Sequence, residues 1–309
     1  MGYALDATGD YVYFTGATGT NKVIVCALNK NDGSIFFQSL LNIVPGTKDR
    51  GYAIKPDNSG NLYVAGVTGS YGYLAKISGI NSTNPNLEWV KNAGLSYGAR
   101  INHLDVDNSG IYISCDIRGV TTYFQVMKVN SDGNLVWAKI FPSYANDRNN
   151  THIVKISGDN LFVGGRIAQD NLDKQNGDGM LMKISKSNDS LLWHGIYFTG
   201  IGLEKAAEHR IKEIAIIGEH VYIAGQVYGG IEKHEHFFGT WVKLDNSELQ
   251  NASVSITSIT TAEYEIITGG EVRDGEGTFS ASTGILQNAT EKTISTTPDW
   301  YAFLIKIKI

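Results

Sequence analysis

Three arginines occupy the same position in a repeated pattern, and they form the strongest candidate in the sequence for binding chemistry. Arg50, Arg100 and Arg210 each begin a run of strand-forming residues, RGYAIKP, RINHLDV and RIKEIAI. Two residues further on, within one residue of register, the aligned positions are Tyr3, Tyr52, Asn102, His152, Lys212 and Ser258. Guanidinium groups bind carboxylates and phosphates through paired hydrogen bonds. Converging arginines backed by aromatic and amide groups therefore predict a site for an anion or a carbohydrate acid.

The same arginines also have a purely structural interpretation. Each guanidinium could pair with an acidic residue of the neighbouring repeat and hold the repeats in register. The ligand-binding interpretation assigns the site to Arg50, Arg100, Arg210, Tyr52, Asn102 and His152. Both interpretations stay open at this point, and neither assigns a catalytic residue.

His234-Glu235-His236 is the sharpest local cluster of metal-ligating residues. In an extended chain the imidazoles of His234 and His236 lie on one side, as a chelate requires. A closed site needs three or four ligands, so His209 or another residue would have to come from a separate loop. A solvated loop is the simpler interpretation. The acidic stretch 170–179 lacks the spacing and the bidentate glutamate of a calcium loop, so we expect no cofactor.

A repeat of short strands must position all of these residues. Small residues recur about fifty residues apart inside apolar runs such as LYVAGVT and LFVGGRI; they are Gly16, Gly66, Cys115, Gly165, Gly225 and Gly270. Glycine packs poorly inside a strand, so Gly66 predicts the close approach of another backbone. One strand precedes each small-residue strand and two follow it, and turn signals such as Asp57–Gly60 separate them.

Four strand types in a fixed order, repeated six times, predict an all-β fold: a six-bladed β-propeller of four-stranded antiparallel blades. A sandwich or a solenoid would not explain this order. We expect one domain over residues 1–309, with units at approximately 1–44, 45–95, 96–143, 144–200, 201–253 and 254–309. The last unit ends after its strand FLIKIKI without a closing strand, so we expect the final blade to be incomplete within this chain. Either the sixth blade has three strands, or an N-terminal segment that held the closing strand is missing, and we favour the missing segment.

The units resemble the bacterial β-propeller repeat called SBBP. The best copy is GYAIKPDNSGNLYVAGVTG followed by GYLAKI, and DWYAFLIKI preserves the middle phrase of that repeat. The resemblance covers nearly the whole chain and is weakest in the first and sixth units. It implies a propeller of the extracellular or cell-surface kind. The SBBP family is defined by its fold and not by one reaction, so function must be argued from sites.

Two further sets of recurring residues have structural interpretations. Trp89, Trp137 and Trp193 are expected to pack on outer strands, and a set of lysines is expected at one equivalent position with solvated ends; these lysines are Lys76, Lys128, Lys183, Lys243 and Lys306. Cys26 and Cys115 fall two blades apart, too far for a disulfide. Both are expected to be buried and reduced.

Composition excludes several classes of function. The 309 residues carry a net charge of −5 with interspersed signs, which argues against a nucleic-acid platform. No apolar run approaches the length of a membrane span. We therefore expect a binding or scaffold propeller that takes an anionic or carbohydrate ligand, or a protein partner through rim loops at 199–210 and 228–239. The alternatives are a sugar-acid lyase or hydrolase at the same channel mouth, and a structural subunit of a larger assembly.

Overall fold

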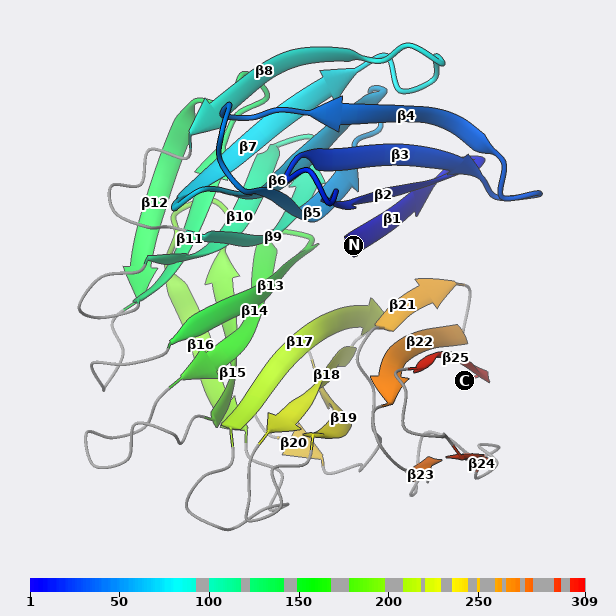
Figure 1. Cartoon of the computed structure of the whole chain (residues 1–309). Helices are drawn as coiled ribbons and strands as arrows, with labels where there is room; N and C mark the ends of the chain where they lie inside the picture. Colours follow the sequence, from blue (N-terminus) through cyan, green and yellow to red (C-terminus); the bar gives the residue numbers. More distant parts are fainter. Residues whose placement is uncertain are drawn as a thin grey trace. The chain divides into compact units, whose positions relative to one another are not determined.

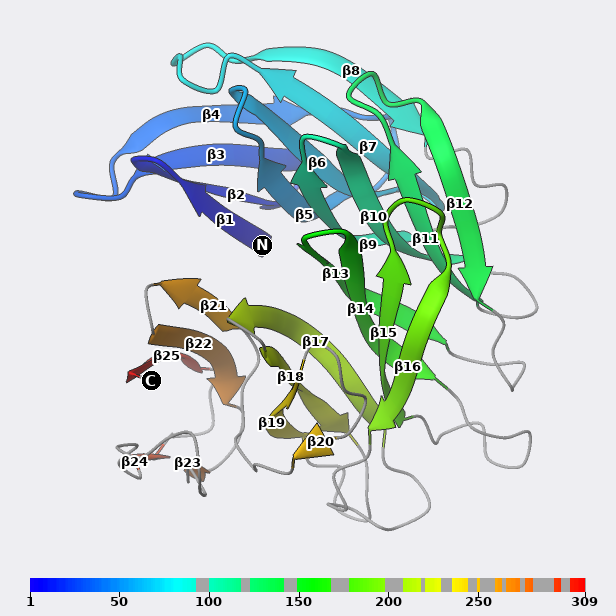
Figure 2. The same ribbon diagram turned by 180° about the vertical axis from the view of Figure 1, so that it is seen from behind.

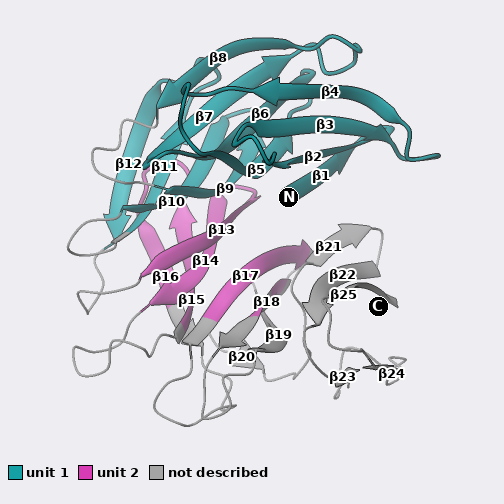
Figure 3. Cartoon of the chain, in the orientation of Figure 1, with its two compact units in different colours: residues 1–142 teal, residues 143–309 magenta. Residues whose placement is uncertain are grey.

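The computed structural model forms two compact units, Met1–Pro142 and Ser143–Ile309 (Figure 3). We describe each unit by itself. The described residues are 1–92, 100–117, 123–141, 149–167, 178–197, 208–217, 220–228, 235–243, 249–250, 259–262, 265–272, 276–279, 292–295 and 301–308. No helix in these ranges is long and apolar enough to cross a membrane.

The first unit contains three four-stranded antiparallel sheets, each built from consecutive strands in chain order. The first sheet comprises β1 (Gly2–Thr8), β2 (Tyr11–Ala17), β3 (Val23–Asn29) and β4 (Ile35–Leu41). The second comprises β5 (Asp49–Pro56), β6 (Asn61–Thr68), β7 (Tyr71–Ser78) and β8 (Asn86–Asn92). The third comprises β9 (Arg100–Asp107), β10 (Gly110–Ile117), β11 (Tyr123–Val129) and β12 (Leu135–Phe141). These boundaries agree with the strand types that the repeat predicts.

The second unit continues the same pattern through two further four-stranded sheets. One comprises β13 (Asn150–Ser157), β14 (Asn160–Ile167), β15 (Asp178–Ser185) and β16 (Leu191–Tyr197). The other comprises β17 (Glu208–Ile217), β18 (His220–Tyr228), β19 (Glu235–Lys243) and β20 (Leu249–Gln250). The sixth predicted repeat contains β21 (Ile259–Ala262), β22 (Glu265–Val272) and β25 (Tyr301–Lys308) in one sheet, and the pair β23 (Glu276–Phe279) and β24 (Lys292–Ser295).

The first strand of each sheet packs against the preceding sheet of its unit. In the first unit β5 contacts β1, β2 and β3, and β9 contacts β5, β6 and β7, so that β1, β5 and β9 lie side by side (Figures 1 and 2). In the second unit β17 contacts β13, β14 and β15 in the same way. This face-to-face packing buries the second and third strands on both sides; Val64, Tyr73 and Ala75 are fully buried. The first strands are therefore placed to present side chains together.

An aromatic residue, a lysine and a tryptophan follow one another across neighbouring strands in three successive sheets. The lysines pair in register with both aromatic neighbours; the three rows are Tyr63–Lys76–Trp89, Tyr112–Lys128–Trp137 and Phe162–Lys183–Trp193. The ring centroids in each row lie 6.1–6.3 Å apart. The structural interpretation of the tryptophans is confirmed. The prediction for Lys243 is wrong. Lys243 pairs with His220, and Trp241 is the residue that pairs with the aromatic residue of the second strand, Tyr222, where the three preceding sheets have a lysine.

The two cysteines are free and buried, as expected. The last three-stranded sheet has the order β21–β22–β25, so β25 pairs only with β22 among the described residues. Residues 2–8 form β1 and pair with β2.

Candidate functional site

A β-bulge recurs at the same place in the first strand of five successive sheets. At each bulge the pairing with the second strand skips one residue; the skipped residues are Tyr3, Tyr52, Asn102, His152 and Lys212. A bulge adds one residue to a strand and redirects its side chain away from the regular alternation. The set predicted from sequence to share a face is therefore the set of bulged residues, for every member that lies within the described ranges.

In three of these sheets the backbone of the first strand leaves no room for a side chain at the recurring glycine. A side chain on Gly66 would overlap the carbonyl oxygen of Arg50, and side chains on Gly16 and Gly165 would overlap the carbonyl oxygens of the equivalent residues, Met1 and Asn150. The predicted close approach of another backbone at Gly66 is confirmed. Cys115 takes the same position in the third sheet, where its side chain is fully buried.

Four side chains from three neighbouring strands of the first unit form a contiguous group, which we name the arginine cluster: Tyr3 on β1, Arg50 and Tyr52 on β5, and Arg100 on β9. Arg50 donates a hydrogen bond from Nη1 to the Tyr52 hydroxyl at 3.3 Å. The Arg100 guanidinium lies over the Tyr52 ring, with Cζ 4.2 Å from the ring centroid. The Tyr3 ring meets the same ring edge-on at 5.1 Å. Tyr52 therefore organises two cationic groups around one aromatic ring.

The arginine cluster carries a net positive charge. Within the described ranges, no carboxylate lies within 4 Å of Arg50 or Arg100, and Nε of Arg100 is buried without a hydrogen-bond partner. The hydrogen bond to Tyr52 raises the pKa of Arg50, so this guanidinium is charged at any physiological pH. Positive charge without an acidic partner is the arrangement expected of an anion site.

Lys55 provides the charge contact between neighbouring sheets that the structural interpretation assigned to the arginines. Its ammonium group lies 2.6 Å from Asp6 on β1 and 3.4 Å from Asp105 on β9. Burial alone would lower the pKa of Lys55, but the carboxylates of Asp105 and Asp6 raise it overall. Lys55 thus links three sheets. The repeat pattern does not predict this contact; its only signal in the sequence is that the three residues stand near the ends of successive first strands.

Of the remaining predicted residues, Asn102 is the bulged residue of β9 in the first unit, and the second unit carries His152 and Arg210. His152 on β13 and Lys212 on β17 are both bulged, and Nζ of Lys212 lies 3.4 Å from Nδ1 of His152. Arg210 pairs in register with Gln226, one residue beyond Gly225, just as Arg50 pairs with Val67 beyond Gly66. The predicted equivalence of the arginine positions is therefore confirmed in register.

Glu213 follows Lys212 on β17. Burial raises its pKa to about 7, although Lys155 and Lys212 pull in the opposite direction. The carboxyl group therefore keeps its proton to a higher pH than an exposed glutamate does.

Other predicted positions lie outside the described residues. His234 and Ser258 fall between described strands, and His236 lies on β19 without a described side chain. The stretch 170–177 is also outside the described ranges. In the part of the chain that is described, no group of three His, Cys, Asp or Glu residues could hold a metal ion.

Comparison with solved structures identifies the fold. The chain is similar to Drosophila Plexin A, solved in complex with Semaphorin 1b, with a TM-score of 0.51 and 7% identity over 80% of this chain and 52% of that chain. It is also similar to the extracellular domains 1–2 of Drosophila Semaphorin 1a, with a TM-score of 0.50 and 12% identity over 79% of this chain and 53% of that chain. The match thus takes in about half the length of each solved chain.

At these identities the likeness shows the fold alone, and that fold is a β-propeller. No protein-family model matches the chain, and no curated protein matches it in sequence. The resemblance to the SBBP repeat therefore rests on the motifs themselves.

Proposed function

We propose that the chain is a non-catalytic binding module, a six-bladed propeller of SBBP-like repeats that recognises an anionic ligand such as a sugar acid. The observation that carries the proposal is the arrangement of Arg50 and Arg100 around Tyr52, with no carboxylate within 4 Å among the described residues. Asn102 in the first unit and His152 in the second take the strand position of Tyr52, and Arg210 in the second unit takes that of Arg50; we propose them as further ligand-binding residues of their own units.

The chemistry of the arginine cluster suits a carboxylate on a sugar ring. Guanidinium groups bind a carboxylate through two parallel hydrogen bonds, each worth about 1.5–3 kcal/mol when charged. Tyr3 and Tyr52 offer aromatic surface beside the two guanidinium groups, against which the apolar face of a pyranose ring can pack. The stacking on Tyr52 also restricts the rotamers of Arg100, which reduces the entropy lost on binding.

Titration calorimetry with galacturonate and galactose, at fixed ionic strength, tests the proposal. We expect galacturonate to bind at the arginine cluster and galactose not to bind there. Arg100→Ala should weaken binding about tenfold or more. Arg100→Lys should keep only part of the affinity, because an ammonium group cannot make the two parallel hydrogen bonds of a planar guanidinium group. Lys48→Ala removes one exposed positive charge two residues from Arg50 and serves as the control.

An equal loss of galacturonate affinity in Lys48→Ala and Arg100→Ala would show that binding depends only on overall positive charge, which would contradict a specific site. Failure of galacturonate, sulfate and phosphate alike to bind or to stabilise the protein would also contradict it.

A second candidate function is a sugar-acid lyase or hydrolase, and one observation favours it. Glu213 has a pKa of about 7 and lies on the same strand as Lys212, which approaches His152. A carboxyl group that titrates near neutrality is suited to general acid–base chemistry. Incubation with polygalacturonate tests both reactions, because elimination yields an unsaturated product with ultraviolet absorbance and hydrolysis yields new reducing ends. Absence of product, together with galacturonate binding, would leave the binding module as the answer.

Recognition of a protein partner, or assembly, through the segments 199–210 and 228–239 remains a separate proposal. These segments are not loops throughout, because residues 208–210 belong to β17, residue 228 to β18 and residues 235–239 to β19. Analytical ultracentrifugation of the purified chain tests self-assembly.

A further inference from the structure

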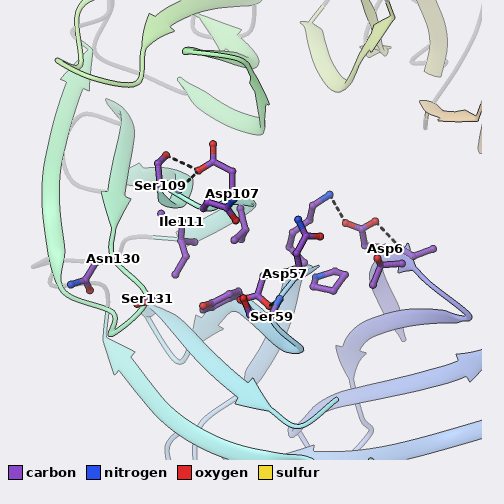
Figure 4. A pocket seen from close by; sticks show the side chains of 17 residues that line it. Asp6, Asp57, Ser59, Asp107, Ser109, Ile111, Asn130 and Ser131 are labelled. Carbon is purple, nitrogen blue, oxygen red and sulfur yellow. Dashed lines mark hydrogen bonds and ion pairs between the residues drawn. The ribbon is translucent and has the colours of Figure 1, made fainter. Parts of the chain in front are cut away.

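A pocket of about 490 Å³ lies in the first unit at the opposite ends of the strands that carry the arginine cluster (Figure 4). It is bounded by the last residues of β1, β5 and β9 and by the turns that follow β5, β9 and β11. Two of these turns are the repeated Asp-Asn-Ser-Gly segments at 57–60 and 107–110. The volume is within the range of small-molecule sites.

The charged residues that line this pocket are Asp6, Asp57, Asp107 and Lys55. Asp6 is paired with Lys55 at 2.6 Å. Asp57 already accepts hydrogen bonds from the backbone N–H groups of Ser59 and Asn61 and from the Asn61 amide. The Tyr63 hydroxyl donates to the Asp57 carboxylate, and burial together with this carboxylate raises the pKa of Tyr63 to about 12. Asp57 is therefore occupied by neutral donors and is poorly available as an ion-pair partner.

Side-chain amides and hydroxyls make up the rest of the polar lining. The amides of Asn58 and Asn108 make no hydrogen bond with any described residue, and both lie in the exposed part of their turns. Asn130 uses its oxygen to accept from the backbone N–H groups of Asp132 and Asn134, which leaves its NH₂ group available. Ser131 completes this side of the pocket. Amides and hydroxyls both donate and accept, so together they match the hydroxyl groups of a sugar.

We infer that this pocket is a second binding site, separate from the arginine cluster, and that it takes an uncharged carbohydrate. The arginine cluster at the beginning of β5 and β9 presents cations. In this pocket Asp6 is already ion-paired and Asp57 already accepts hydrogen bonds, whereas the side-chain amides of Asn58 and Asn108 make no hydrogen bond with a described residue. An anion would meet Asp6, Asp57 and Asp107 here without a guanidinium partner. A divalent cation is also disfavoured, because no cluster of three carboxylate or histidine ligands occurs among the described residues.

Saturation-transfer NMR and titration calorimetry with uncharged disaccharides (maltose, cellobiose, lactose and chitobiose) test this inference. We expect at least one of them to bind. The double variant Asn58→Ala/Asn108→Ala should weaken that binding by about fivefold for each amide removed. Ser131→Trp should abolish it, because Ser131 is exposed and a larger side chain can fill the pocket without disturbing the core. Asn42→Ala removes an exposed amide outside the pocket and should leave binding unchanged.

Two variants distinguish this site from the proposed anion site. Arg100→Ala should abolish the response to galacturonate and retain the response to the disaccharide, and Ser131→Trp should show the reverse. Thermal unfolding of each variant verifies that it is folded.

The inference is overturned if none of the disaccharides binds, or if Ser131→Trp binds as tightly as the unmodified protein. It is also overturned if the diamine putrescine binds at the pocket and the sugars do not, since that result would assign the pocket to cations.

Discussion

Replacing Gly66 with alanine tests whether the bulge on β5 is what holds Tyr52 and Arg50 in place. The new Cβ would overlap the carbonyl oxygen of Arg50 and lie 2.9 Å from its carbonyl carbon. Both obstacles are backbone atoms, so no side-chain rotation can relieve them. Overpacking typically destabilises by about 1–3 kcal/mol, and a backbone clash belongs at the upper end, about 3 kcal/mol. Relief of the clash must shift the strand at Arg50, so the arginine cluster should be disturbed as well.

Differential scanning calorimetry measures this effect. At about 2.1 cal/mol/K per residue, the unfolding entropy of the 309-residue chain is about 0.65 kcal/mol/K, and a loss of about 3 kcal/mol lowers Tm by about 5 °C. Gly19→Ala is the matched control, since a Cβ there meets nothing within 4 Å and Gly19 has no positive φ. Galacturonate affinity should fall in Gly66→Ala and remain unchanged in Gly19→Ala. Equal Tm values for the two variants would refute the requirement for glycine at the bulge.

Three further predictions concern single groups. Glu213→Gln should flatten the pH dependence of stability. Burial raises the pKa of Glu213 to about 7 from an unfolded value of about 4.3, so the protonated form contributes up to about 4 kcal/mol of stability below about pH 4, and that contribution is lost as pH rises through about 7. Urea midpoints across this pH range measure the slope, and an identical slope in the variant would contradict the assignment. Lys55→Met should lower the free energy of unfolding by about 2 kcal/mol, because it leaves Asp6 and Asp105 without their shared cation. An unchanged urea midpoint in Lys55→Met would show that the contact contributes nothing. Burial raises the pKa of the Cys115 thiol far above its usual range, and Asp116 adds to this, so Ellman's reagent should react with it only after denaturation. Rapid reaction of two thiols in the native protein would contradict the buried positions.

The register of the first strand of each sheet could be predicted from the sequence, because the repeated units can be aligned with one another. Comparing successive copies placed Arg50, Arg100 and Arg210 at one register position, and the ladders confirm it. The positions of Trp89, Trp137 and Trp193 followed in the same way. Lys243 departs from the pattern because the strand after Gly225 places Trp241 where the other sheets place lysine.

The contacts between sheets could not be predicted in this way. A bulge changes the direction of a side chain by inserting one residue, and the alternation of apolar and polar residues does not record which residue is extra. Tyr52 was therefore expected on the correct face without any indication that Arg100 would stack on it. The approach of Lys55 to Asp6 and Asp105 depends on the twist between sheets, which local sequence does not specify. The sequence predicts the two turns that contain Asn58 and Asn108, but it does not predict that they border one pocket, because that also depends on the twist between sheets.

At two interfaces between neighbouring sheets a glycine on one sheet lies against a larger side chain on the other, and the sheet that carries the glycine differs from one interface to the other. Thr15 on β2 faces Gly51 on β5, so that a side chain on Gly51 would overlap Thr15. Between β14 and β17 the sizes are reversed, and a Cβ on Gly164 would come within 2.6 Å of Ile211. Thr15 and Gly164 occupy the same position of their strands, one residue before the recurring glycine. A copy of the second repeat inserted after the fourth would place Gly51 opposite Gly164 and leave a void. The repeats are therefore not interchangeable parts: each is fitted to its own predecessor, and their order along the chain is fixed by the shapes they present to one another.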